Sequence, residues 1–231
     1  MATWSVDNIY KLFKFLMRQN QSGSISTTDF FNAWNTEQNA YFSDELGKWQ
    51  NRNNGKSGNN TGLIMNETIM TDLAAFTIPG SVTIASGVAT KPSDFIYGLA
   101  RRLDDGTSEN LVTKINHGQI WYVNNDVIDP PSVTDGTYYI IEYEDYYKVL
   151  PDTATGDLLL DYIAQPVDVI WGYTWDAQNR KVYNAGLSIQ PQWKTPTIIQ
   201  ITKRALTSFG VSYKDKDFEN FGKANTATGD S

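Results

Sequence analysis

The first part of the chain carries apolar residues at the spacing of amphipathic helices. Over residues 5–19 they recur at intervals of three and four, and Ser5 is placed to cap the first turn. A second helix is predicted to begin near Ser26 or Thr27, where Asp29 would lie at the positive end of the helix dipole. Two N-terminal helices are therefore expected to bury one face each.

A polar segment separates these helices from a third. Residues 50–62 contain three Gly and no hydrophobic residue, which predicts a loop. Residues 64–76 then return to helical spacing, and Pro79 and Gly80 are expected to end this third helix.

From residue 81 the period of the pattern shortens to two, as in half-buried strands. Val82 and Ile84 alternate with polar residues, and the clearest run predicts one strand over 137–150, for which 158–163 is the expected partner. The expected extended segments are 81–84, 111–123, 137–150, 158–163 and a hairpin within 172–183.

The last helix has signals at both ends. Thr195 can cap it, Pro196 fits the first helical position, and Gly210 follows the final turn. Residues after 214 become polar and small, which predicts a flexible tail.

Together these elements predict an α+β protein in which N-terminal helices and a C-terminal helix form a helical bundle with an inserted antiparallel β subdomain. The expected parts are a helical part over 1–80, a β insert over 81–193, a helix over 194–213 that packs on the helical part, and a tail over 214–231.

The composition supports a folded protein made in a reducing compartment. The 231 residues are 40% hydrophobic and 13% aromatic, enough to bury a core, and no Cys is present, which excludes disulfides and thiol chemistry. We expect no signal peptide and no membrane span, because no basic, apolar leader and no long apolar run occurs.

Charge is unevenly distributed within the net value of −7. Residues 126–176 hold eleven acidic side chains and one basic side chain, Lys148. Such a block argues against a nucleic-acid-binding surface, which needs clustered Lys and Arg side chains. It suits either a solvated face that maintains solubility or a surface that DNA slides past or a basic partner meets.

The segment around Gly23 has partial calcium-loop spacing. With Gly23 at loop position 6, Asp29 falls at position 12, but Arg18, Asn20 and Ser22 would occupy positions 1, 3 and 5. A hard divalent cation needs carboxylate oxygens there, so an ordinary turn explains the residues better.

Catalytic candidates are equally weak. His117 is the only histidine, and no serine or acid has motif spacing to it. Glu142, Glu144 and Asp145 are clustered, but any acid-rich chain offers such groups, and no phosphate-binding Gly loop occurs. We therefore assign no catalytic, cofactor-binding or metal-binding residue and do not expect an enzyme.

The aromatic residues leave a second function open. Trp121, Trp171 and Trp175 could form a sugar-stacking platform. A carbohydrate-binding or host-attachment module of a phage or bacterial surface is therefore the alternative to a structural protein.

Several short segments resemble the head–tail connector ring (tail adaptor) proteins of crAss-like and related podoviral phages. The order of these segments along the chain carries the resemblance, which covers most of the sequence. They are 5–11, 19–26, the Lys91-Pro92-Ser93-Asp94-Phe95 run, the Asp129-Pro130-Pro131 run, 160–166 continuing to Trp171, and the closing helix with Phe209-Gly210-Val211.

The resemblance implies a virion structural protein without catalytic residues. Such a protein would form a homo-oligomeric ring, expected as a dodecamer, in the connector below the portal protein. DNA would pass through its lumen without sequence-specific binding, and its outer surfaces would dock other ring and tail proteins. It would be assembled in the host cytoplasm and would not involve a membrane.

Overall fold

A computed structural model describes residues 4–19, 25–53 and 71–209. The chain divides into two units, which are considered separately. A helical unit is formed by Met1–Ala75 with Pro166–Ser231, and a β unit is formed by Phe76–Gln165. The β unit is thus inserted between the two sequence parts of the helical unit.

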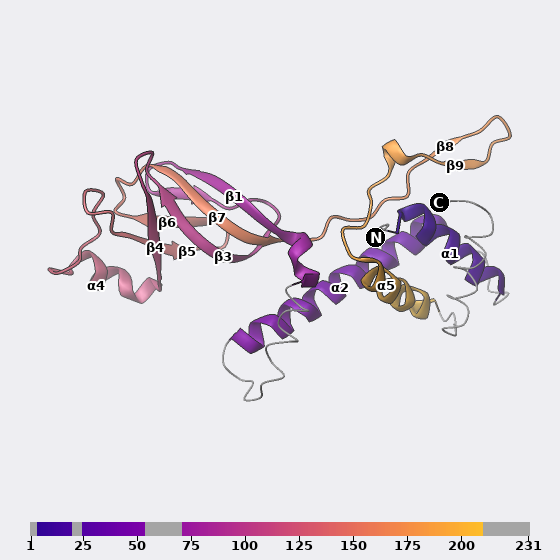
Figure 1. Ribbon diagram of the computed structural model, residues 1–231, viewed down its shortest axis with the longest axis horizontal. Helices are drawn as coiled ribbons and strands as arrows, with labels where there is room; N and C mark the ends of the chain where they lie inside the picture. Colours follow the sequence, from indigo (N-terminus) through magenta and orange to yellow (C-terminus); the bar gives the residue numbers. More distant parts are fainter. Residues whose placement is uncertain (1–3, 20–24, 54–70, 210–231) are drawn as a thin grey trace. The chain divides into compact units, whose positions relative to one another are not determined.

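The longest elements described in the helical unit are the helices α1, α2 and α5, which a small hairpin accompanies (Figure 1). In the first helix, residues at intervals of three and four are fully buried, among them Val6, Ile9 and Leu16. The Ser5 hydroxyl accepts a hydrogen bond from the Asn8 amide and caps this helix as predicted. The elements are α1 (Val6–Gln19), α2 (Thr27–Asn53), β8 (Tyr173–Trp175), β9 (Lys181–Tyr183), the 3₁₀ helix η3 (Ala185–Leu187) and α5 (Thr195–Ser208).

Helix α5 packs against α2 through a buried face. Ile198 and Ile201 are fully buried, and the Trp34 indole Nε1 donates to the Thr202 hydroxyl at 3.1 Å. This bond satisfies an indole N–H that would otherwise be left without a partner in the core. Thr195 was the predicted N-cap, but the N-cap is Lys194 and Thr195 is the first helical residue. Pro196 lies in the first turn, where its missing N–H is tolerated.

The β unit is a seven-stranded sheet that nearly closes into a barrel. Its strand order is β1-β7-β3-β4-β5-β6-β2, and a bridge between Ala85 and Val88 joins the two end strands. The elements are β1 (Thr77–Ile84), β2 (Val88–Thr90), β3 (Phe95–Asp104), β4 (Glu109–Ile115), the 3₁₀ helix η2 (His117–Gln119), α4 (Ile120–Asn124), β5 (Tyr138–Glu142), β6 (Tyr146–Leu150) and β7 (Gly156–Ala164); the 3₁₀ helix η1 (Ala74–Phe76) precedes β1.

The interior of this sheet is filled by side chains. Residues from all seven strands form one cluster, and Leu103, Ile140, Val149 and Leu158 in it have no exposed surface. A second, smaller cluster joins Ile115, Ile141 and Leu150 to the inner side chains of α4. The short helix is thereby fixed to the sheet by apolar contact.

The predicted helical bundle is wrong. The described part of the chain is dominated by the nearly closed seven-stranded sheet, and only α1, α2 and α5 exceed one or two turns within it. An α+β composition fits only loosely. The limits of the β unit also lie at 76 and 165 rather than at 81 and 193, because residues 166–193 join the helical unit.

The residues that were expected to end the third helix lie in a strand instead. Residues 71–73 are helical, but Pro79 and Gly80 lie within β1. Pro79 is tolerated because β1 ends the strand order, where a missing N–H breaks no ladder. Gly80 lies close to Tyr162, and a Cβ added there would be 3.0 Å from the tyrosine ring, which would have to shift slightly. The predicted helix over 64–70 lies outside the described residues, as do most of the 50–62 loop, the Gly23 segment, Gly210 and the tail.

Three strand predictions also need correction. The run over 137–150 is a hairpin of β5 and β6, in which the Tyr143 amide donates to the Tyr146 carbonyl. Residues 158–163 belong to β7, which pairs with β1 and β3. The sheet is not purely antiparallel either, since β4 and β5 run parallel. Alternation identifies a buried face but does not specify which strand lies beside it.

Candidate interaction surfaces

The surface of the β unit carries an exposed apolar segment. Helix α4 places Ile120 and Val123 inward on the smaller cluster, so that Trp121 and Tyr122 point outward. Trp121 is 68% exposed and meets the Tyr122 ring edge to face at a centroid distance of 5.3 Å. Two large aromatic side chains thus lie in solvent on a short helix that is packed against the sheet.

The loop that follows α4 presents two further apolar side chains. Val127 is 94% exposed and Ile128 is 95% exposed. The Asp126 carboxylate accepts backbone hydrogen bonds from Ile128 at 2.9 Å and Asp129 at 3.3 Å, which forms an Asx turn. The turn fixes the backbone that holds these side chains outward. We call residues 126–131 the acidic–apolar loop.

The helical unit carries a second exposed apolar element, the β8–β9 hairpin (Figure 1). All three residues of β8 are exposed, and Trp175 retains 57% of its surface. The Lys181 ammonium lies 4.2 Å from the centre of the Tyr173 ring. The hairpin is tied to the rest of the helical unit, because Tyr173 stacks on Trp171 and the Tyr183 hydroxyl accepts from the Gln190 side-chain amide at 2.9 Å.

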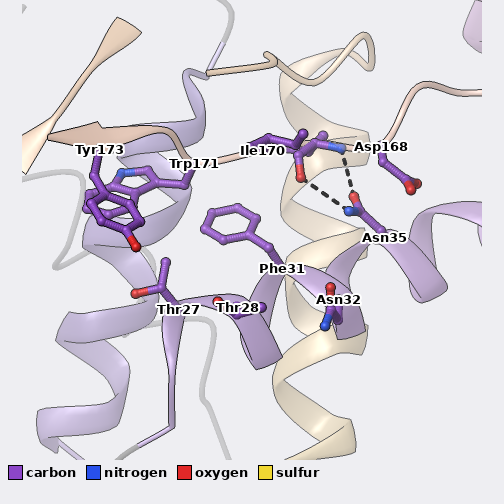
Figure 2. A pocket seen from close by; sticks show the side chains of 10 residues that line it. Thr27, Thr28, Phe31, Asn32, Asn35, Asp168, Ile170, Trp171 and Tyr173 are labelled. Carbon is purple, nitrogen blue, oxygen red and sulfur yellow. Dashed lines mark hydrogen bonds between the residues drawn. The ribbon is translucent and has the colours of Figure 1, made fainter. Parts of the chain in front are cut away.

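A pocket of about 360 Å³ lies next to this hairpin (Figure 2). Asn35 holds one wall, since its side-chain amide donates to the Val169 carbonyl and accepts from the Val169 amide. Figure 2 shows the aromatic side chains at one end and Asp168 at the other. The lining residues are Thr27, Thr28, Phe31, Asn32, Asn35, Asp168, Val169, Ile170, Trp171 and Tyr173.

The predicted three-tryptophan platform is not present. Trp171 is only 7% exposed, and its indole Nε1 donates to the Asp7 carboxylate at 3.2 Å. Trp121 belongs to the β unit, whereas Trp175 is in the helical unit. Of the three tryptophans, Trp175, with Tyr173 at its edge, remains exposed in the helical unit.

The acidic block 126–176 contains one strongly paired carboxylate. Glu142 lies within hydrogen-bonding distance of three cations: Lys114 at 2.5 Å, Lys91 at 3.0 Å and Arg101 at 3.2 Å. Burial alone would raise the pKa of Glu142, but the hydrogen bonds from Lys114 and Lys91 outweigh it and the pKa is lowered. Beside this cluster, burial raises the pKa of Tyr147 to about 12.

Other acids of the block have one ion-pair partner or are exposed. Asp176 pairs with Arg180 at 2.9 Å and Asp152 with Lys148 at 3.4 Å, whereas Glu144 and Asp145 are exposed in the β5–β6 turn. The block also crosses from the β unit into the helical unit. It is therefore not one uniform acidic surface.

The remaining sequence candidates have structural partners. His117 is exposed and meets the Tyr143 ring edge to face. The Asp29 carboxylate accepts from the Ser26 hydroxyl at 2.6 Å, and the Ser26 hydroxyl accepts from the Asp29 amide, an arrangement that caps α2. Over the described ranges, no three His, Asp or Glu side chains are grouped so as to hold a metal ion.

No helix in the described part of the chain is both long and apolar enough to cross a membrane. Comparisons with known proteins add no identification: no family model matches the chain, and no curated protein matches it.

Proposed function

We propose that this chain is a virion structural protein that forms an oligomeric ring in the head–tail connector of a tailed phage, below the portal protein. In this proposal DNA passes through the lumen of the ring and other tail components dock on its surfaces. The proposal rests on the resemblance of several short segments, in their order along the chain, to connector ring proteins. It also rests on one structural observation.

That observation is the exposure of large apolar side chains on both units. Val127 and Ile128 lie almost entirely in solvent on the acidic–apolar loop, and Trp175 lies on a two-stranded hairpin. Contiguous exposed apolar groups are typical of interaction sites. Two different surfaces of this kind suit a ring, in which each subunit meets its neighbours through unlike faces.

The segments that carry the resemblance hold structural positions consistent with this use. In the Lys91–Phe95 run, Lys91 binds Glu142, the Asp94 carboxylate accepts from the Tyr162 hydroxyl, and Phe95 packs against the barrel core. The Asp129-Pro130-Pro131 run lies in the exposed acidic–apolar loop. The first run stabilises the β unit. In the second run, Asp129 accepts hydrogen bonds from the Thr137 and Tyr139 hydroxyls, and Pro130 is exposed.

A carbohydrate-binding module is the second candidate, because an aromatic pair adjoins the pocket. Tyr173 and Trp175 are exposed, and Asn32 and Thr28 line the pocket beside them. Aromatic faces with nearby amides and hydroxyls can bind sugars by stacking and hydrogen bonding. Asn35 is held in place by its two hydrogen bonds to Val169, which use one of its two N–H groups and one acceptor position.

Negative-stain imaging of the purified chain, alone and mixed with portal protein, tests the first proposal against the second. A ring in either sample supports the connector function. A monomer that is indifferent to portal, with Trp fluorescence that responds to glycans, contradicts it and favours the carbohydrate-binding module.

A further inference from the structure

The apolar pair of the acidic–apolar loop protrudes from the β unit. Val127 is 94% exposed and Ile128 is 95% exposed, although aliphatic side chains of this size are usually buried. A side chain that keeps nearly all of its exposure has almost no neighbours, so a partner that covers it must be concave. Exposed apolar groups of this kind mark surfaces that bind another molecule.

The charges beside this pair are all negative along the chain. Asp126 precedes the pair and Asp129 follows it, and residues 115–147 contain no Lys or Arg. The cations on either side of this stretch, Lys114 and Lys148, already pair with acids of the β unit. The loop therefore presents an apolar centre between two carboxylates.

Hydrogen bonds to these carboxylates leave their charge in place. Backbone amides donate to Asp126, and the hydroxyls of Thr137 and Tyr139 donate to Asp129. All of these donors are neutral, and no ion pair joins Asp126 or Asp129 to a cation in the part of the chain that the structure describes. Both acids can thus gain a cation from a partner.

This combination selects one kind of partner. An apolar cleft covers the aliphatic pair, and Lys or Arg side chains at the rim of the cleft meet the acids, as in interfaces with an apolar centre and a polar rim. The chain itself has a net charge of −7 and is not the favoured source of a basic rim. A lipid surface is disfavoured as well, because anionic headgroups repel carboxylates.

We propose that the acidic–apolar loop inserts Val127 and Ile128 into an apolar cleft of a different protein, where Lys or Arg side chains at the rim bind Asp126 and Asp129. The inference rests on the proposed function, in which other tail components dock on the chain, and names the surface chemistry of one such component. It does not depend on the number of subunits in the ring.

An aminated β-cyclodextrin is the probe, because it has an apolar cavity rimmed by ammonium groups. Neutral and carboxylated β-cyclodextrins keep the cavity and change the charge of the rim. Binding to the full-length chain is followed by methyl NMR at Ile128. The signal of Ile96, which is 40% exposed on β3, reports non-specific association. Each signal is identified by its loss in the corresponding Ile→Val variant.

The Ile128 signal should shift with the probe while the Ile96 signal stays in place. We expect the aminated probe to bind about fivefold more tightly than the carboxylated probe, which is the combined effect of two exposed ion pairs.

Two matched double variants test the origin of this preference. Asp126→Asn with Asp129→Asn removes both charges, while the amide oxygens can still accept the hydrogen bonds. The preference for the aminated probe should then fall below about twofold. Glu144→Gln with Asp145→Asn removes the same charge from the exposed β5–β6 turn and should keep the preference.

Several results would overturn the inference. One is an Ile128 signal that does not respond to the aminated probe, or that responds equally to all three probes. Self-association in light scattering that Ile128→Asp abolishes would assign the loop to a second copy instead. Binding to neutral phosphatidylcholine vesicles that the same variant abolishes would assign it to a lipid surface. Thr153→Asp, at another exposed position of the β unit, is the control in both assays.

The inference and the ring function can fail separately. Rings in the negative-stain images, together with an unresponsive Ile128 signal, would remove the loop contact and leave the ring function standing. A chain that stays monomeric with portal protein, together with a charge-selective Ile128 response, would remove the ring function and leave the chemistry of the loop standing.

Discussion

At the scale of single residues, the most consequential contact is the one between Glu142 and its three cations. Lys91, Arg101 and Lys114 come from different segments of the β unit and converge on one carboxylate that is mostly shielded from water. Like charges held close together repel one another unless an acid lies between them. Glu142 therefore stabilises the fold by its charge rather than by forming part of an acidic surface.

Glu142→Gln is expected to destabilise the β unit by about 2 kcal/mol, because it leaves three cations facing a neutral amide. The matched control is Glu109→Gln, which removes an exposed pair with Arg102 and should cost less than about 1 kcal/mol. Urea denaturation of both variants gives the comparison. Equal losses would show that the Glu142 cluster contributes no more than a surface pair.

The same residue predicts a pH dependence. A lowered pKa means that Glu142 contributes stability above its unfolded pKa and loses this contribution as the pH falls through its folded pKa, below the ordinary value of 4.5. The stability difference between the wild-type chain and Glu142→Gln should therefore shrink in acid. A difference that stays constant below that pH would contradict the ionic origin of the effect.

Residue-level signals in the sequence predicted the helix starts but not the contacts between distant segments. The Ser5 cap and the start of α2 beside Asp29 follow from local hydrogen-bonding rules and are confirmed. The convergence of Lys91, Arg101 and Lys114 on Glu142 could not be predicted, because it depends on strand pairings between residues far apart in the chain. The pocket likewise depends on residues 168–173 meeting α2.

At the scale of elements, helix α5 has a buried face on which a charged substitution is expected to unfold the helical unit. Ile201 is fully buried where α5 packs against α2. Ile201→Asp should unfold the helical unit, since a buried unpaired charge costs more than the stability of a typical domain can absorb. Gln200→Asp, on an exposed position of the same helix, should stay folded. Far-ultraviolet circular dichroism distinguishes the two results; a folded Ile201→Asp protein would show that α5 is peripheral.

The boundaries of some strands could not be predicted from the sequence pattern. The predicted strand over 111–123 stops at Ile115, because a capping box between Asn116 and Gln119 starts η2 and then α4. The spacing of three between Ile120 and Val123 was a helical signal within that run. The hairpin around Asp176 is confirmed, since its turn residues and flanking strands are local.

At the scale of the whole molecule, the two units differ in how their cores are made. The sheet of Phe76–Gln165 begins and ends on strands that pair with each other, since Thr77 faces Ile163. Its core is supplied by its own strands. We therefore expect residues 76–165 to fold when produced alone.

Thermal unfolding of this fragment checks the expectation. A cooperative transition with the near-ultraviolet spectrum of packed tyrosines is the predicted result. A fragment without a transition would mean that the β unit needs the helical unit for stability, and that the chain is a single cooperative body.

The central claim, that this chain forms a closed ring, is tested most directly by native mass spectrometry of the wild-type assembly, formed alone or on portal protein and then released. Our account predicts one dominant species at a fixed integral multiple of the 26.0 kDa chain, expected as a dodecamer. A monomer under every condition, or a ladder of open-ended oligomers without a preferred size, would contradict it.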